Sequence, residues 1–154
     1  MSWGRPLKSI LSIFDKKIVS FNFHHLVSSN STFVDKDLEI KKKIFNNFKT
    51  YEKFFEKKGV YVDQNKRFKC INRNFSKILN ANKLKINDNP KLIDEVVNLV
   101  DSPNVLFCNF DKRFLSMPKE ILTLTMETHQ KYFPTFNDKN EITNQFLIVS
   151  NKKD

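Results

Sequence analysis

A change of hydrophobic period in the last third of the chain constrains its fold more than any other feature. Pro118 suits a first helical turn, where no N–H is needed, and Glu120 suits the positive end of the helix dipole. Apolar residues recur at helical spacing from Ile121 to Met126. The period then shortens to two, and a polar turn at residues 137–140 separates two alternating runs. The pattern predicts a helix followed by a β-hairpin.

Upstream of this segment, helical and alternating patterns follow one another along the chain. They predict an α/β (α+β) fold with a mixed β-sheet and interleaved amphipathic helices in a single domain, with possible lobes 1–62 and 63–154. We expect helices at residues 43–58, 64–82 and from Pro90 to a stop at Ser102. Strands are expected as a pair within residues 1–26 with a turn at 15–17, and at 38–40, 60–62 and 105–107.

The overall composition leaves the nature of the partner open. The 154 residues carry a net charge of +10, which meets the first test for a nucleic-acid partner. Sixteen phenylalanines beside only two glycines, with abundant lysine, also fit the residue drift of an AT-rich genome. Hydrophobic residues make up 40% without an apolar run long enough for a membrane, so we expect a soluble cytoplasmic chain.

Catalytic and metal-binding motifs are missing from the sequence. Two glycines cannot supply a glycine-rich phosphate loop, and no nucleophile elbow is present. The available soft metal ligands have none of the spacings of structural zinc sites, and we predict no metal site from them: His24, His25, Cys70, Cys108 and His129. We therefore predict no catalytic residue and no cofactor bound by this chain.

Two groups of residues remain as candidates for binding RNA. Arg67, Lys69 and Arg73 lie on a basic face of the helix expected at 64–82, where they could contact phosphates. Such a face is more often only solvated. His129, Gln130 and Lys131 end the later helix, where they offer polar donors or simply offset its negative dipole end.

A series of residues in the C-terminal third resembles one protein family. The family pattern is a Phe-Asp/Glu-x-x-Phe-Leu segment, a Pro-x-Glu helix start, Thr-Met, then Gln-Lys-Tyr-Phe-Pro and a strand ending in Asn. The matching residues are Phe110, Asp111, Phe114, Leu115, Pro118, Glu120, Thr125, Met126, Gln130, Lys131, Tyr132, Phe133, Pro134 and Asn151. The series resembles the β subunit of the bacterial two-subunit glycyl-tRNA synthetase. Arg67 matches a family arginine as well.

Near the N-terminus the agreement with this family is less complete. Trp3 and Gly4 agree with a Met-Arg-Trp-Gly segment, but Ser2 replaces its arginine. A Gly-His-Arg-Phe motif expected near residues 28–33 is absent, with Phe33 as its only remnant. The resemblance implies an internal piece of the subunit that has lost some substrate or RNA contacts.

The resemblance implies a non-catalytic domain that supports binding and positioning of glycine tRNA and subunit assembly. Its expected partners are that tRNA, the α subunit and the remaining β-subunit domains. The α subunit would carry the ligase chemistry, and ATP and Mg would serve the whole enzyme. One alternative is a scaffold domain that never contacts RNA. Another is a hydrolase using His24 or His129 with a nearby carboxylate, although no acid/base arrangement is recognisable.

Overall fold

The computed structural model describes residues 7–34 and 41–151 of the chain. The strand expected at 38–40 and the N-terminal residues of the family resemblance lie outside the described residues. The chain divides into two compact units, Met1–Lys57 and Lys58–Asp154. The possible lobes suggested by the sequence were 1–62 and 63–154. Each unit is described by itself.

The first unit consists of short strands and one helix. Its strands are β1 (Ile10–Leu11), β2 (Ile13–Phe14), β3 (Lys17–Ile18), β4 (Asn22–Phe23), β5 (Leu26–Ser29), β6 (Ser31–Phe33) and β7 (Lys42–Ile44). β1 pairs in parallel with β5, which pairs antiparallel with β4, while β2–β3 and β6–β7 are antiparallel pairs. Asp15 and Lys16, at φ 45° and 65°, make the tight turn between β2 and β3, as the primed hairpin turns require. The predicted turn is confirmed.

The helix of this unit, α1 (Phe48–Lys57), is shorter than predicted. Ile44 pairs with Ser31 in the β6–β7 ladder, so its backbone is extended and its side chain is 63% exposed. Phe45 is 2% exposed and its ring lies 5.2 Å from that of Tyr51 and 5.6 Å from that of Phe54. Burial in this aromatic cluster raises the pKa of Tyr51. The helix predicted from residue 43 was therefore wrong over its first turn.

The second unit alternates helices and strands. Its elements are α2 (Gln64–Asn82), β8 (Lys85–Ile86), α3 (Pro90–Leu99), β9 (Asn104–Asn109), a 3₁₀ turn η1 (Lys112–Ser116), α4 (Lys119–Leu124), a π-helical segment η2 (Thr125–Gln130), β10 (Phe133–Phe136) and β11 (Ile142–Ser150). The bounds predicted for α2 agree with the structure, and the predicted helix and hairpin of the last third are confirmed. The strand predicted at 60–62 was wrong, since that segment forms no strand; Tyr61 N–H donates to Asp101 O at 2.7 Å.

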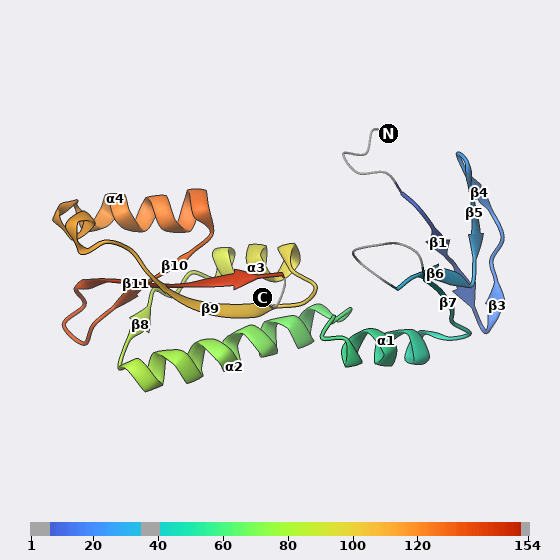
Figure 1. Cartoon of the computed structure of the whole chain (residues 1–154), viewed down its shortest axis with the longest axis horizontal. Coiled ribbons are helices and arrows are strands. Elements are labelled where there is room, and N and C mark those ends of the chain that lie inside the picture. Colours follow the sequence, from blue (N-terminus) through green and yellow to red (C-terminus); the bar gives the residue numbers. More distant parts are fainter. Residues whose placement is uncertain (1–6, 35–40, 152–154) are drawn as a thin grey trace. The chain divides into compact units, whose positions relative to one another are not determined.

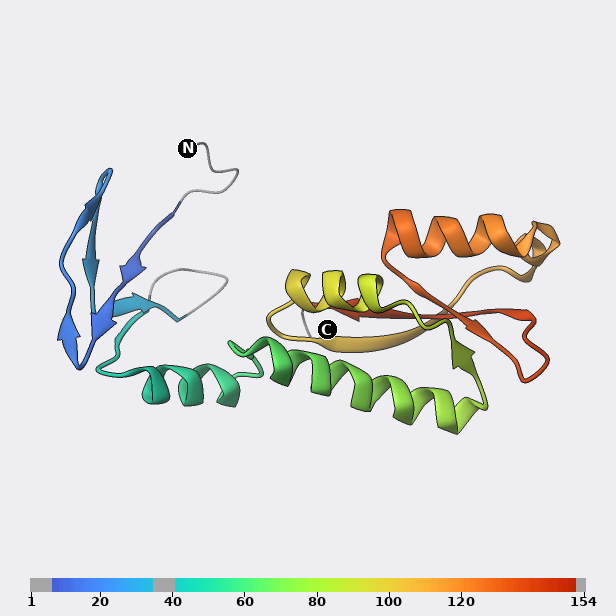
Figure 2. The same ribbon diagram turned by 180° about the vertical axis from the view of Figure 1, so that it is seen from behind.

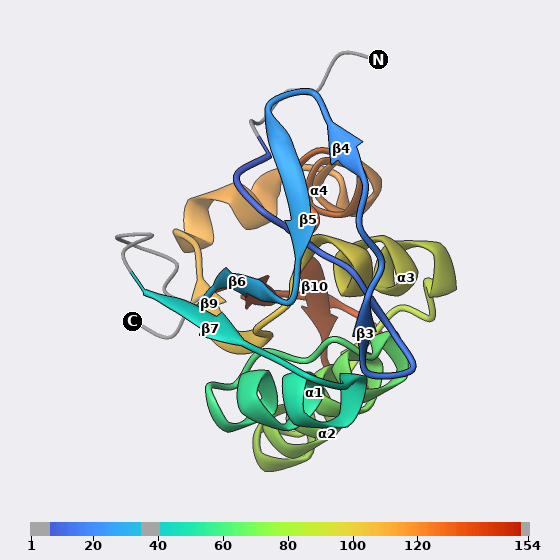
Figure 3. The ribbon, with the colours of Figure 1, turned by 90° about the vertical axis from the view of Figure 1, so that its right-hand side faces the viewer.

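Four antiparallel strands in the order β8–β10–β11–β9 form the sheet of this unit. Figure 1 shows α2 and α4 on opposite sides of the β10–β11 hairpin. The end-on view in Figure 3 keeps the same order of layers. From behind, α3 lies nearer the viewer than β9 and β11 (Figure 2). With the parallel pair of the first unit, the chain has the mixed sheets and interleaved helices that the sequence predicts, and the fold class is confirmed.

The core of the second unit lies where α2 and α3 pack against the sheet. Side chains alternate between the two faces of the sheet along each strand, and directly paired residues face the same side. One face of the sheet therefore contributes its side chains to this core. Phe133 of β10 pairs with Leu147 of β11, and their side chains are 3% and 0% exposed. The buried cluster contains Ile71, Phe75, Leu92, Val96, Val97, Val100, Phe133 and Leu147.

Local hydrogen bonds set the helix ends. Asp63 accepts from Asn65 N–H at 2.8 Å at the start of α2. Asn89 accepts from Leu92 N–H at 3.1 Å at the start of α3, with Pro90 at the first helical position. Both are preferred N-cap residues, because a short side-chain oxygen satisfies a first-turn N–H. These caps explain why the sequence located the starts of both helices.

Gly59 adopts a left-handed backbone conformation in the turn that follows α1, with φ of +77°. A Cβ added there would lie 3.7 Å from Ser102 Oγ, which is an ordinary contact, so any penalty comes from the backbone. Gly59→Ala is expected to lower the free energy of unfolding by about 1–2 kcal/mol, because alanine resists the left-handed region. Gly59→Asn is expected to cost less, since asparagine tolerates it. Urea unfolding of both variants tests this order, and equal stability of Gly59→Ala and the parent contradicts it.

Candidate nucleic-acid interface

One side of α2 carries a row of basic side chains that face solvent. Lys69, Arg73 and Lys77 are exposed and recur every four residues, which places successive side chains about 6 Å apart along the axis. The 19 residues of α2 include no acidic residue. Among the described residues, no carboxylate lies within ion-pair distance of these three. We call Lys69, Arg73 and Lys77 the basic row.

The helix period directs the basic row away from the sheet. Ile71 and Phe75, on the opposite side of α2, are 0% and 3% exposed and belong to the core. The structure thus brings two predicted residues, Lys69 and Arg73, into one row. Lys77 completes it, and the same four-residue spacing could have identified it from the sequence.

Arg67 has a different environment from the basic row. Its Nε donates to Val97 O at 3.0 Å, and its Nη1 donates to Tyr61 O at 2.7 Å and to Val62 O at 2.9 Å. These bonds join the first turns of α2 to the end of α3 and to the segment before α2. The guanidinium is therefore engaged with the protein's own backbone, and a contact between Arg67 and RNA stays a prediction.

His129, Gln130 and Lys131 lie together where η2 ends. Lys131 adopts φ of 57°, its N–H donates to Met126 O, and its Nζ lies 2.9 Å from Glu95 Oε2 of α3. His129 and Gln130 are exposed. The continuous helix formed by α4 and η2 and the helix α2 lie on opposite sides of the hairpin (Figure 1). The two predicted groups therefore do not share one face.

Glu127 holds the η2 segment against the start of α3. Its Oε2 accepts from Asn89 Nδ2 at 2.8 Å and its Oε1 accepts from Asn87 Nδ2 at 3.2 Å. Together with the Lys131–Glu95 pair, this contact supports the interpretation of residues 129–131 as a capped helix end. Their binding to RNA remains a separate prediction.

The candidate metal ligands remain scattered. Within residues 7–34 and 41–151, no three His, Cys, Asp or Glu side chains come together in a way that could hold a metal ion. Cys70 and Cys108 are free thiols. His24 lies in the left-handed turn between β4 and β5, against the ring of Phe23.

None of the described helices combines the length and the apolarity needed to cross a membrane.

Several residues of the C-terminal series have structural roles. Asp111 Oδ1 accepts from Arg113 N–H at 2.9 Å and caps η1. The ring of Tyr132 stacks on that of Phe146 with centroids 5.1 Å apart. Asn151 Oδ1 accepts from the N–H groups of Asp101 and Ser102 at 2.8 and 2.9 Å. These contacts connect the sheet to the segments that precede and follow it.

Comparison with known proteins identifies close similarity along the whole chain. The family profile described as glycyl-tRNA synthetase beta subunit matches residues 1–154. The glycine–tRNA ligase beta subunit of Rickettsia akari (strain Hartford) is 35% identical over 151 residues, which cover 98% of this chain and 23% of the relative. The corresponding proteins of Rickettsia africae (strain ESF-5) and Rickettsia bellii (strain OSU 85-389) are each 36% identical with the same coverage. The chain thus spans less than a quarter of the length of these relatives.

Proposed function

Because this chain belongs to the glycyl-tRNA synthetase beta-subunit family, we propose that it is a non-catalytic domain that supports the binding and positioning of glycine tRNA. The observation that carries the proposal is the basic row on α2. Lys69, Arg73 and Lys77 are exposed, evenly spaced and without a carboxylate partner among the described residues. Exposed cations without a carboxylate partner are available to pair with the phosphates of an RNA backbone.

The proposed mechanism is electrostatic positioning. Each cation that neutralises a phosphate releases condensed counterions, so binding weakens steeply as salt rises. Phosphate contacts fix orientation but do not read sequence. Discrimination of glycine tRNA therefore belongs to other parts of the enzyme. The basic row fixes the position and orientation of the RNA backbone on the domain.

The remaining roles follow from the family. We place the ligase chemistry, with its ATP and magnesium, on the α subunit, and the whole assembly in the cytoplasm. The domain would also contribute to assembly with the α subunit and with the remaining β-subunit domains.

Replacing the basic row tests the proposal. Lys69→Ala/Arg73→Ala/Lys77→Ala is expected to weaken binding of glycine tRNA. It should also reduce the salt slope of log K by about one unit for each phosphate that the variant no longer neutralises. Fluorescence titrations at several salt concentrations, with glycine tRNA and an unrelated tRNA, measure both effects. Arg67 stays unchanged, because its replacement would disturb the fold.

A matched control is available on α1. Lys49, Lys53 and Lys57 have the same four-residue spacing and are exposed, but α1 also carries Glu52 and Glu56. Lys49→Ala/Lys53→Ala/Lys57→Ala removes the same charge and should leave most of the affinity and the salt slope. If both triple variants weaken binding equally, total charge explains the effect and the basic row is not the site.

The second candidate function is a scaffold without RNA contact. It is favoured by the internal engagement of Arg67 and Lys131, two predicted contacts that bind the protein's own groups. Absence of tRNA binding by the parent chain even at low salt would support the scaffold and refute positioning by the basic row.

A further inference from the structure

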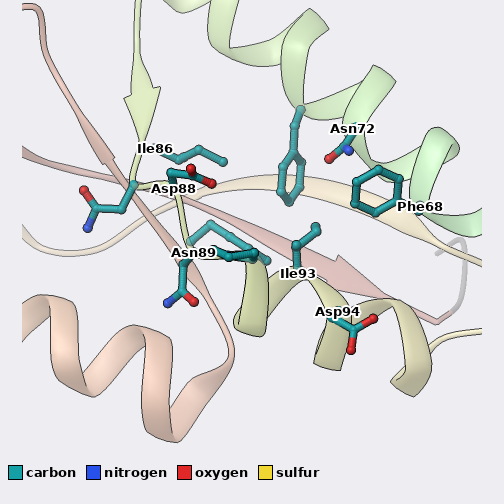
Figure 4. A pocket seen from close by; sticks show the side chains of 11 residues that line it. Phe68, Asn72, Ile86, Asp88, Asn89, Ile93 and Asp94 are labelled. Carbon is teal, nitrogen blue, oxygen red and sulfur yellow. The ribbon is translucent and has the colours of Figure 1, made fainter.

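A pocket opens between α2 and the start of α3, away from the basic row. Its cavity volume is about 320 Å³, within the range of small-ligand sites. Figure 4 shows Phe68 and Asn72 on one side, Ile86 and Asp88 beside β8, and Ile93 and Asp94 on α3. Its walls are formed by Phe68, Asn72, Phe75, Ile86, Asn87, Asp88, Asn89, Pro90, Ile93, Asp94 and Phe133.

The floor of the pocket is apolar and firmly held. Phe75 and Phe133 are each 3% exposed, and their rings meet edge to face at 4.8 Å. Ile86 and Ile93 pack against the same core. Phe68, at 43% exposed, lines the pocket but remains open to solvent. An occupant would therefore meet a rigid hydrocarbon floor and an accessible aromatic ring.

The charge of the lining is negative, in a chain whose net charge is +10. Asp88 and Asp94 are the charged residues of the lining, which includes no lysine, arginine or histidine. Among the described residues, neither carboxylate has a cation within ion-pair distance. Asp94 Oδ1 accepts from the amide of Gln64 at 3.3 Å.

Two of the three asparagines are already engaged. The amide groups of Asn87 and Asn89 donate to Glu127, whereas the side chain of Asn72 makes no hydrogen bond within the described segments. The groups available to an occupant are thus two carboxylates, one amide and an aromatic face. This combination disfavours phosphate, because like charges repel.

We propose that this pocket binds the side chain of an arginine or lysine presented by another polypeptide segment. The long stem of such a side chain packs on apolar surface while its charged head stays near water. Its guanidinium or ammonium can pair with Asp88 or Asp94 and lie over the ring of Phe68. The pocket supplies each of these contacts within one cavity.

The occupant is assigned to a polypeptide because the chain spans only 23% of the length of its relatives. In those proteins more than three quarters of the polypeptide lies outside the region matched here, and any basic segment of it is covalently available. The inference is separate from the basic row, which faces another side of α2. Failure of one proposal leaves the other intact.

NMR titration of the ¹⁵N-labelled chain tests the pocket directly. The probes are N-acetyl-arginine N-methylamide, its neutral citrulline counterpart, free arginine and inorganic phosphate. Blocked arginine is expected to shift the amide signals of Phe68, Asn72, Asp88 and Ile93, and to bind more tightly than blocked citrulline. Phosphate should leave these signals unchanged. Tighter binding of free arginine would assign the pocket to a free amino acid and overturn the polypeptide assignment.

Variants locate the interaction. Asp88→Asn/Asp94→Asn is expected to weaken binding of blocked arginine by about two- to tenfold, the effect of removing one or two exposed ion pairs. Asp15→Asn/Glu120→Gln changes the same charge at two exposed sites outside the pocket and should bind as the parent does. Retained amide spectra show that each variant is folded. The proposal fails if arginine and citrulline bind equally, if the pocket variant binds normally, or if no pocket signal shifts up to the solubility limit of the probe.

Discussion

Phe133→Ala is expected to lower the free energy of unfolding of the second unit by about 3–5 kcal/mol, as for other buried Phe→Ala changes. Phe133 is 3% exposed, pairs with Leu147 across the hairpin and meets the ring of Phe75 at 4.8 Å. The substitution removes a ring from the junction of α2 and the sheet. Phe75 and Leu147 are held in place by the helix and the sheet, so they fill the space only in part and a cavity remains.

Urea denaturation followed by circular dichroism measures this destabilisation. Phe133→Leu should recover much of the stability, since hydrophobic swaps of similar volume cost less than about 1.5 kcal/mol. Phe114→Ala is the control, because Phe114 is 41% exposed and leaves no closed cavity. Equal destabilisation by Phe133→Ala and Phe114→Ala would show that the hairpin is not packed as described.

Arg67→Ala is expected to lower the free energy of unfolding by about 2–4 kcal/mol, because hydrogen bonds to charged groups contribute about 1.5–3 kcal/mol each and are not additive. The side chain donates to the carbonyl groups of Val97, Tyr61 and Val62. Its removal leaves partly buried carbonyls unpaired and releases the end of α3 from the start of α2.

Two further variants separate charge from geometry. Arg67→Lys keeps the charge but cannot reach three carbonyls with a planar fork, so it should recover only part of the stability. Arg73→Ala removes an exposed arginine from the same helix and is expected to change stability by less than about 0.5 kcal/mol. Thermal and urea unfolding of the three variants tests this order. An Arg67→Ala protein as stable as Arg73→Ala would return Arg67 to the candidates for RNA contact.

Helices with local signals could be predicted from the sequence. The bounds of α2 follow from the cap at Asp63 and from an apolar face, Phe68 to Leu79, that keeps the helical period over about three turns. The start of α3 follows from Asn89 and Pro90 in the same way. These signals lie within a few residues of the structure they determine, which is why they are readable without knowledge of the fold.

Segments whose partners lie elsewhere in the chain could not be predicted in the same way. Residues 43–45 continue the helical pattern of α1, but Ile44 pairs with Ser31 and becomes a strand. Residues 60–62 have strand-like composition, yet they form no strand: Tyr61 N–H donates to Asp101 O, and the carbonyl groups of Tyr61 and Val62 accept from Arg67. In both places a tertiary partner, or its absence, overrode local preference.

The candidate site likewise has one part that the sequence determines and another that depends on the tertiary structure. The basic row was determined by the sequence, because a spacing of four residues places Lys69, Arg73 and Lys77 on one side of any α-helix. Tertiary structure decided the role of Arg67, since its acceptor Val97 lies 30 residues away. It also decided the pocket, which brings Phe68 of α2 together with Asp94 of α3. Helical periodicity is a local property of the chain, whereas hydrogen-bond partners and cavities depend on how distant segments pack.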